Sequence, residues 1–218
     1  MVIAIDGPAG SGKSTIAKML ARKLGFLFLD TGAMYRALTL KVIEERIPVD
    51  HEEKITGLAA SLDFRFDGDK VILDGKDVSA AIRTPEIDKA ISPVCRIPGV
   101  RHHLVELQRK LALDSSCVCE GRDTTTVVFP DADVKVYLTA NVEERARRRL
   151  ADFQKKGIDV DYETVRSEVI RRDQADMSRE VGPLKKADDA YELDTTGLTI
   201  EQVAQRIYTL AREKQYDY

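Results

Sequence analysis

Residues 3–18 read IAIDGPAGSGKSTIAK, and this stretch decides the fold. Residues 7–14 fit the pattern G-x-x-x-x-G-K-[ST] without a mismatch. A short apolar run, residues 2–5, precedes the pattern, and apolar residues at helical spacing follow it up to Gly25. The glycines let several backbone N–H groups converge on one anion, and the start of the helix adds its positive end. The stretch therefore predicts a loop that holds the phosphates of a nucleoside triphosphate.

Each position of this phosphate loop has an expected task. Lys13 should reach the β- and γ-phosphates, and the Ser14 hydroxyl should be a ligand of Mg²⁺. The expected nucleotide-binding residues are Gly7, Pro8, Ala9, Gly10, Ser11, Gly12, Lys13, Ser14 and Thr15. The pattern indicates a bound triphosphate and leaves the phosphoryl acceptor open.

Outward from the loop, strand and helix patterns alternate. Strands are expected at 2–5 and 26–29, each followed by a helix, at 13–24 and 33–46. Later come a helix at 100–113, strands at 117–120, 134–138 and 190–194, and helices from 141, over 162–177 and after Thr199. Asn141 with Glu144, and Thr199 with Gln202, have the spacing of capping pairs. This alternation predicts an α/β fold with a parallel sheet.

The middle of the chain follows a different pattern. Residues 63–79, DFRFDGDKVILDGKDVS, alternate apolar and polar side chains with Asp-Gly pairs at the bends, which is typical of antiparallel hairpins. Residues 82–98 contain Pro85, Pro93 and Pro98, which are expected to break any helix there. We therefore interpret residues 63–98 as an insertion beside the main sheet.

Composition narrows the class of protein. A chain of 218 residues suits one domain with insertions, and its net charge of −3 provides no basic field for nucleic acid. No apolar run is long enough to span a membrane, and the N-terminus lacks a signal-peptide pattern, so we expect a cytoplasmic protein. The three cysteines, Cys95, Cys117 and Cys119, are interpreted as reduced core thiols.

Two classes of phosphate-loop protein compete: a nucleotide-hydrolysing switch or motor, and a kinase for a small molecule. A GTPase switch would show Asn-Lys-x-Asp, which is absent from the sequence. A motor would show an apolar strand ending in Asp. Residues 134–138 run into Thr139 and Ala140 instead, and residues 117–120 with Glu120 imitate such a strand only weakly.

Three further segments favour a kinase. LDTGAMYRA, residues 29–37, and EGRDTTTVVFPDA, residues 120–132, both follow strands of the predicted sheet and so lie at the phosphate-loop edge. Arg36 is expected to contact an anion there. In the third segment, residues 143–180, Arg145 and Arg147 are interpreted as a solvated helix face with i,i+4 pairs. Arg172, Asp176 and Arg179 fall on one helical stripe, where two guanidiniums can clamp a phosphate.

These segments together resemble the cytidylate kinases of bacteria. The resemblance covers essentially the whole length through IAIDGPAGSGKST, LDTGAMYRA, IRTPE, GRD followed by TVVFPDA, EERARRR, RRDQADMSR and DTTGLTIEQV, in that order. It implies a single P-loop kinase domain over 1–218, with a five-stranded parallel sheet flanked by helices. Residues 63–98 would be the enlarged monophosphate-binding insertion, and residues 145–180 the helical lid.

The resemblance also implies an activity, namely transfer of the γ-phosphoryl group of ATP to CMP or dCMP with Mg²⁺. A kinase for UMP or AMP and a nucleotide-binding switch or ATPase are the alternatives. Lys13, Arg172 and Arg179 would be catalytic. The residues around CMP would be Thr31, Arg36, Ser92, Arg101, Arg122, Asp123, Arg172, Asp176 and Arg179. No nucleic-acid or membrane partner is expected. The protein should be a monomer and should act in pyrimidine nucleotide metabolism.

The chemistry of each side chain suggests which part of CMP it would contact. Asp123 would accept from the cytosine N4 amino group, and Arg101 and Ser92 would donate to the acceptor side of the ring. Arg36, Arg122 and Arg172 would hold the monophosphate, and Asp176 a ribose hydroxyl. Thr124 and Thr125 stand where the family usually has an apolar residue and a glycine, so the loop near Asp123 is expected to differ. Residues 195–198 are a candidate for part of the adenine site.

Overall fold

The computed structural model describes residues 1–216, which form two compact units. One, the sheet unit, comprises residues 1–28 and the chain from 115 onward; the other, the hairpin unit, comprises Leu29–Asp114. Each unit has its own hydrophobic core. The interpreted insertion, residues 63–98, lies inside the hairpin unit, which extends well beyond it on both sides.

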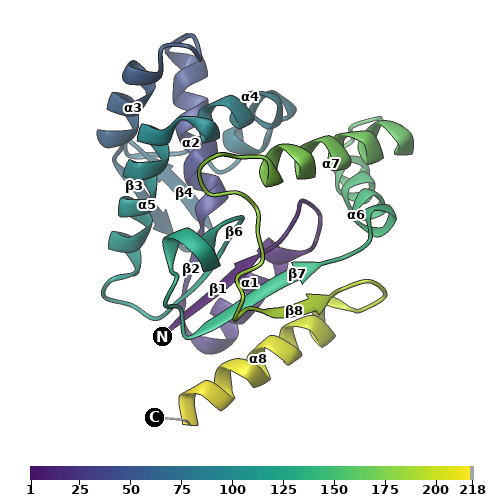
Figure 1. The fold of residues 1–218 in the computed structure, drawn as a ribbon. Helices are drawn as coiled ribbons and strands as arrows, with labels where there is room; N and C mark the ends of the chain where they lie inside the picture. Colours follow the sequence, from purple (N-terminus) through teal and green to yellow (C-terminus); the bar gives the residue numbers. More distant parts are fainter. Residues whose placement is uncertain (217–218) are drawn as a thin grey trace. The chain divides into compact units, whose positions relative to one another are not determined.

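A five-stranded sheet is the frame of the site, in the order β2-β6-β1-β7-β8 (Figure 1). The strands are β1 (Val2–Asp6), β2 (Leu27–Asp30), β6 (Cys117–Gly121), β7 (Val134–Thr139) and β8 (Tyr191–Asp194). Strand β1 pairs in parallel with β6 and β7, and its last residue, Asp6, lies opposite Gly121 and Tyr137. The loops that follow these three strands therefore leave the sheet at one edge. The predicted parallel sheet is confirmed.

Among the described residues, the sheet unit also contains the α-helices α1 (Lys13–Leu24), α6 (Val142–Lys155), α7 (Tyr162–Met177) and α8 (Ile200–Tyr216), and a π-helical turn (Thr124–Val128). Helices α1 and α8 pack on each other and on the sheet, and α6 lies beside α7 (Figure 1). Ile5, Leu20 and Ile207 are fully buried between sheet and helices. Burial of this apolar layer is the main stabilising term for the frame.

Both predicted capping pairs are formed. The Glu144 N–H donates to Asn141 Oδ1 at 2.8 Å, so Asn141 begins α6. The Gln202 N–H donates to Thr199 Oγ1 at 3.2 Å, and the Thr199 N–H donates to Gln202 Oε1 at 2.9 Å, a reciprocal capping box. These short motifs fix where α6 and α8 begin.

The hairpin unit contains α2 (Thr31–Glu44), α3 (Glu52–Ala60), a 3₁₀ turn (Ala81–Arg83), α4 (Pro85–Arg96) and α5 (Pro98–Ala112). Its antiparallel sheet has the order β3-β4-β5, made of Phe64–Asp67, Lys70–Leu73 and Lys76–Asp77. The hairpins predicted for residues 63–79 are therefore confirmed. Met34, Ile55 and Leu104 are fully buried in this unit's core.

The prediction that prolines break residues 82–98 was wrong. Pro85 is in the first turn of α4 after the cap residue Thr84, where a missing N–H is tolerated, and Pro98 begins α5. Helix α4 also continues through Pro93. The apolar side chains of Ile87, Ile91 and Val94 are all buried. We conclude that burying this face outweighs the hydrogen bond that Pro93 removes.

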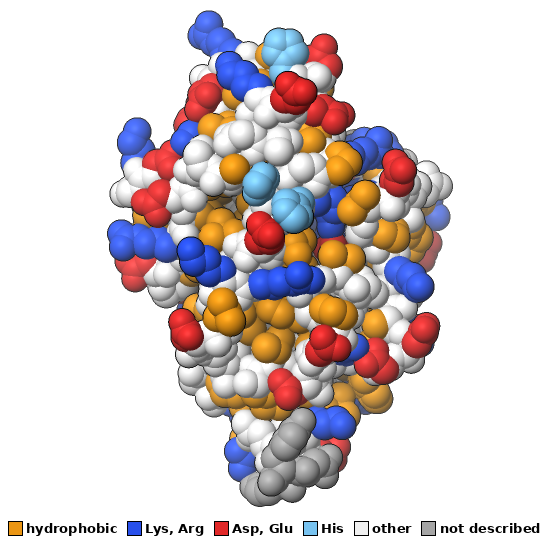
Figure 2. Space-filling view, turned by 60° about the vertical axis from the view of Figure 1, so that its left-hand side comes forward, with side chains coloured by type: hydrophobic (Ala, Val, Ile, Leu, Met, Phe, Trp, Pro, Cys, Tyr) orange, Lys and Arg blue, Asp and Glu red, His pale blue; other side chains and the backbone are white. Residues whose placement is uncertain are grey.

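The surface is mixed in charge. Figure 2 shows Lys and Arg side chains interspersed with Asp and Glu over one face, with histidine side chains exposed among them. Within residues 1–216, no helix combines the length and apolar character needed to cross a bilayer. Cys95, Cys117 and Cys119 are buried and form no disulfide, as the sequence predicted.

Candidate phosphoryl-transfer site

The phosphate loop joins β1 to α1 and is held by close backbone contacts. Gly7, Gly10 and Gly12 have φ angles of 150°, 77° and 92°. A Cβ added at Gly7 would lie 2.0 Å from the carbonyl oxygen of Leu138 in β7, and one at Gly10 would lie 3.0 Å from that of Arg145 in α6. Only glycine fits these positions, so β7 and the start of α6 set the shape of the loop.

Lys13, the loop lysine, is buried and turned onto its own loop. Its Nζ donates to the carbonyl oxygen of Pro8 at 2.8 Å and to Ser11 Oγ at 3.4 Å. Burial and, to a smaller extent, the nearby charge of Arg122 lower the pKa of Lys13 to about 7, although Glu120 and Asp6 partly oppose the shift. The lysine therefore gives up much of its charge at neutral pH unless an anion enters the loop.

Nucleotide binding should therefore take up a proton. At pH 8.5, Lys13 is mostly neutral in the free protein, and triphosphate oxygens beside Nζ should raise its pKa and protonate it. We expect an uptake of about one proton, and an affinity for a non-hydrolysable ATP analogue that falls from pH 7 to pH 9. Titration calorimetry at pH 8.5 in HEPES and in Tris checks this, because the two buffers release protons with different heats. Equal heats in both buffers would contradict it.

Glu120 is a candidate site residue that the sequence motifs did not single out. Ser14 Oγ, in the first turn of α1, donates to Glu120 Oε1 at 2.5 Å, and Glu120 is buried near the end of β6. The sequence does contain a sign of this carboxylate, since Glu120 directly follows the apolar run CVC, residues 117–119, at the end of a predicted strand. A hydroxyl and a carboxylate are hard oxygen donors. Mg²⁺ takes one or two such protein ligands beside substrate phosphates, so the pair fits this ion.

A buried ionic cluster centres on Asp176. Arg122 Nε donates to Asp176 Oδ2 at 2.8 Å, and Arg179 donates to Oδ1. Burial alone would raise the pKa of Asp176, but the charges of Arg122, Arg179 and Arg172 together hold it below its ordinary value. The cluster thus keeps several cationic groups at one anionic centre.

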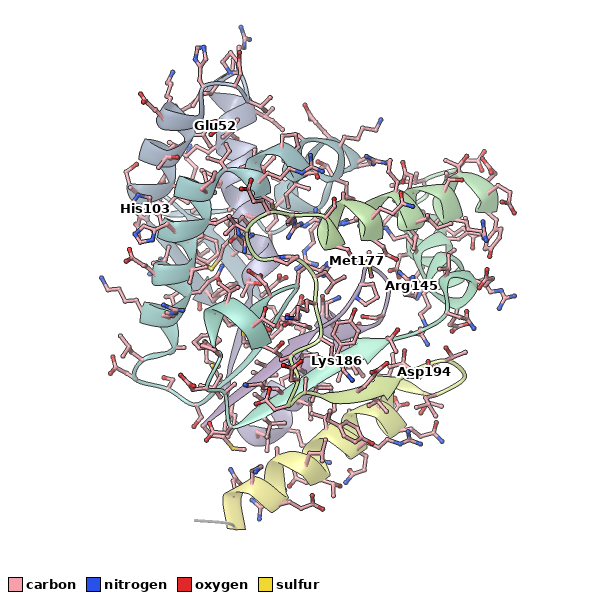
Figure 3. All side chains as sticks on the ribbon, viewed as in Figure 1. Glu52, His103, Arg145, Met177, Lys186 and Asp194 are labelled. Carbon is pink, nitrogen blue, oxygen red and sulfur yellow. The ribbon has the colours of Figure 1, made fainter. Side chains whose placement is uncertain are left out.

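The predicted stripe on α7 needs one correction. Helix α7 ends at Met177, which Figure 3 labels, and Ser178 is its cap, so Arg179 lies beyond the helix. Arg179 still reaches Asp176 because the chain continues in a turn, and the Leu184 N–H donates back to the Asp176 carbonyl oxygen at 2.9 Å. The spacing correctly predicted that Arg179 lies near Asp176, but it assumed a helix through Arg179, whereas α7 ends two residues earlier.

The prediction for Arg145 was wrong. Its side chain, which Figure 3 labels, is only 5% exposed and donates three hydrogen bonds. Nε donates to the Ala140 carbonyl oxygen at 2.9 Å, and Nη1 donates to Asp173 Oδ2 at 2.5 Å and to the Ala9 carbonyl oxygen at 3.2 Å. Arg145 therefore ties α6 to α7 and to the phosphate loop. Arg147, by contrast, has a 69% exposed side chain 3.9 Å from Glu144, as predicted.

Arg148 contacts the loop that the sequence suggested for adenine. Its Nη1 donates to Thr195 Oγ1 and its Nη2 to the Thr195 carbonyl oxygen, both at 2.9 Å, while Nε donates to Glu144 Oε1 at 3.0 Å. Thr195 is buried, and its hydroxyl in turn donates to the Thr139 carbonyl oxygen at 3.0 Å. Local sequence pattern gives Arg148 no role, because its partner Thr195 is nearly fifty residues away.

In the hairpin unit, the predicted ligand residues lie on α2, α4 and α5. Thr31 begins α2 and is buried, with Asp30 as the cap residue. Arg36 is ion-paired with Asp88 at 2.6 Å and donates to the Ile82 carbonyl oxygen at 3.2 Å. Ser92 is half-buried on α4, and Arg101 is buried on α5. Arg101 lies with its guanidinium 5.6 Å from the ring centre of Tyr35.

The structure therefore brings together Lys13, Ser14, Glu120, Arg122, Asp176 and Arg179 within the sheet unit. Electrostatic contributions to the pKa of Lys13 from Arg122, Glu120 and Asp176 reflect that proximity. A loop lysine, a hydroxyl–carboxylate pair and a guanidinium cluster are the groups that phosphoryl transfer needs.

Comparison with known proteins decides the family. The cytidylate kinase model matches residues 3–213. The chain belongs to the cytidylate kinase family. A cytidylate kinase of Caldanaerobacter subterraneus subsp. tengcongensis is 51% identical, covering 97% of this chain and 94% of that protein. A cytidylate kinase of Bacillus subtilis is 46% identical, covering 97% and 96%.

Solved structures support the fold of this family member. A gluconokinase from Sinorhizobium meliloti, 16% identical, covers 100% of this chain and 95% of its own with a TM-score of 0.51. An uncharacterized protein from Eubacterium ventriosum, 14% identical, covers 96% of each chain with a TM-score of 0.53. At such identities the likeness concerns the fold alone, and the predicted P-loop kinase fold is confirmed.

Proposed function

We propose that this cytidylate kinase family member transfers the γ-phosphoryl group of ATP to the phosphate of CMP or dCMP, yielding ADP and CDP or dCDP. The observation that carries this proposal is the family match over residues 3–213, in a chain whose phosphate loop and arginine cluster are both formed. A kinase for UMP or AMP, a switch and an ATPase are not favoured, because the matched relatives are named cytidylate kinases.

The acceptor brings its own nucleophile. A nucleoside monophosphate, with a second pKa of about 6, is largely dianionic at neutral pH, so no general base is needed. The chain's task is to bring two polyanions together in line. Lys13, Arg172 and Arg179 are the proposed catalytic cations, and arginine stabilisation in related reactions is worth on the order of 10³–10⁵ in rate.

Magnesium fits the oxygen donors of the loop. Ser14 and Glu120 would hold Mg²⁺ with the triphosphate, directly or through its water shell. When bound, the ion supplies positive charge to the β- and γ-phosphate oxygens. The chain's own residues then orient the phosphates through Lys13 and the loop N–H groups.

The acceptor residues are proposed one by one. In the sheet unit, Asp123 would accept from cytosine N4, Asp176 would bind a ribose hydroxyl, and Arg122, Arg172 and Arg179 would bind phosphate. In the hairpin unit, Thr31, Arg36, Ser92 and Arg101 would bind the nucleotide. The ion pair of Arg36 with Asp88 is compatible with a further contact to a phosphate. A guanidinium has five N–H donors, and the contacts described above use one on Nη1 and one on Nη2.

Larger parts of the chain also have proposed tasks. Residues 63–98 would serve as the monophosphate-binding insertion, and residues 145–180, with α6 and α7, as a lid that closes over both nucleotides. Closure would exclude water and so suppress hydrolysis of ATP. We further propose that the protein acts in the cytoplasm as a monomer and has no nucleic-acid partner.

Release of ADP tests the activity. Mg-ATP is supplied with CMP, dCMP, UMP, AMP or no acceptor, and ADP is followed by a coupled assay. We expect strong release only with CMP and dCMP. Release without an acceptor would identify an ATPase, and equal release with UMP or AMP would identify a different monophosphate kinase.

Substitution of Asp123 tests recognition of the base. Asp123→Ala removes the proposed acceptor for cytosine N4, a contact whose loss costs on the order of 1–3 kcal/mol. We expect KM for CMP to rise about 10–100-fold while KM for ATP changes less than threefold. Steady-state kinetics with each nucleotide varied in turn checks this. An unchanged KM for CMP would show that another group recognises the base.

A further inference from the structure

Asp6 is a fully buried carboxylate, 0% exposed, at the end of β1 and directly before the phosphate loop. A carboxylate in such a place is unfavourable unless donors surround it. Neither the sequence motifs nor the proposed chemistry gives it a task, because Asp6 precedes the loop and none of the expected nucleotide contacts involves it.

Two threonines supply the donors. The N–H and the hydroxyl of Thr124 donate to Asp6 Oδ1 at 2.9 and 2.8 Å. The N–H and the hydroxyl of Thr125 donate to Oδ2 at 2.7 and 2.6 Å. Both threonines are buried, at 0% and 1% exposure, so water does not compete. Each carboxylate oxygen is thus held by one backbone and one side-chain donor from the same residue.

These contacts pin a two-residue span at both ends. On one side of Arg122 and Asp123, Gly121 lies opposite Asp6 in the parallel ladder. On the other side, Thr124 and Thr125 are fixed to the Asp6 side chain. They also begin a π-helical turn, in which the Val128 N–H donates to the Asp123 carbonyl oxygen at 3.2 Å. Arg122 and Asp123 therefore have one residue, Asp6, as their anchor at each end.

We propose that Asp6, clamped by Thr124 and Thr125, is a positioning residue that holds Arg122 and Asp123 in the geometry that binds the monophosphate nucleotide. The inference rests on the proposed function of those two residues. The threonine hydroxyls are the decisive part of the clamp. Backbone N–H groups are available from almost any residue, whereas only hydroxyl side chains here add the second donor to each carboxylate oxygen. Charge-assisted bonds of this kind are roughly twice as strong as neutral ones.

A valine–serine comparison isolates the hydroxyls. Thr124→Val/Thr125→Val keeps the shape of the side chains and both N–H donors but removes both hydroxyls. Thr124→Ser/Thr125→Ser keeps the hydroxyls and removes only methyl groups. For the valine pair we expect KM for CMP to rise about tenfold while KM for ATP stays within twofold, and the serine pair to stay within twofold for both. The single variant Thr125→Val, with a smaller rise, replaces the valine pair if that pair does not fold.

The results separate positioning from a merely structural role. A folded valine variant whose KM for CMP stays within twofold of the unmodified protein overturns the inference. So does an equal rise of KM for both nucleotides, or a serine pair as impaired as the valine pair. Hydrogen exchange of residues 117–129 gives an independent readout, in which the valine pair should lose amide protection at residues 121–125 and the serine pair should keep it. If the unmodified protein does not phosphorylate CMP, the proposed function fails, and this exchange comparison still tests the clamp.

Discussion

Lys13→Met is expected to lower kcat by about 10³-fold without unfolding the protein. Lys13 is the proposed cation for the transferred phosphoryl group, and loss of one preorganised group in a desolvated site typically costs 10²–10³ or more in rate. Methionine fills the same buried space without a charge to desolvate. A coupled assay of kcat at saturating ATP and CMP measures the loss, and circular dichroism verifies the fold.

The pH dependence of stability provides a second check on Lys13. Its pKa of about 7 in the folded state lies below the ordinary value of 10.5. Between those values the unfolded chain binds more protons, so Lys13 makes the free energy of unfolding rise with pH. Lys13→Met should remove that contribution.

Lys54→Met, at an exposed position on α3, is the matched control for the kcat of Lys13→Met and should leave kcat within twofold. An active Lys13→Met variant would contradict the assigned role.

Arg179→Ala is expected to lower kcat by about 10²–10³-fold. The proposed reason is that Arg179 balances the charge that spreads over the transferred phosphoryl group. The fold should survive, because Asp176 keeps its ion pair with Arg122 at 2.8 Å. Loss of the neighbouring cation should also move the pKa of Asp176 upward, toward its ordinary value. Single-turnover kinetics with ATP and CMP bound measures the chemical step directly.

Arg147→Ala is the matched control for this arginine. Its side chain is 69% exposed and only 3.9 Å from Glu144, an arrangement worth little in water. We expect it to keep kcat within twofold and to leave thermal stability nearly unchanged. If both alanine variants lost the same activity, the effect would come from net charge, and the specific role of Arg179 would be refuted.

Local patterns predicted the frame of the molecule well. The phosphate loop, the parallel strands, the hairpins of residues 63–79 and both capping pairs depend on neighbours in the chain, so spacing and residue type are enough to identify them. The error at Pro93 has the opposite origin. The local rule for proline was applied correctly, but burial of one face of α4 outweighed it.

The contacts that define the site were less accessible to such reasoning. Arg145 pairs with Asp173, Ser14 with Glu120, and Asp6 with two threonines 118 and 119 residues away in the chain. A helical charge pattern shows i,i+4 partners on the same helix, and Arg145 was assigned to solvent on that basis. Its partner is on the next helix instead. Pairing across elements depends on packing, which a single sequence does not encode by spacing.

Burial of the cysteines has a practical consequence for studying motion in this protein. Desolvation raises the pKa of Cys117 to about 11 and that of Cys119 well above its ordinary value, so at pH 7 only about one Cys117 in 10⁴ is a thiolate. Thiol-directed dyes should therefore leave these two sulfurs unmodified. Asp159→Cys would put a reactive thiol at an exposed position between α6 and α7. A fluorophore attached there would test the proposed nucleotide-driven movement of these helices without prior removal of those two native cysteines.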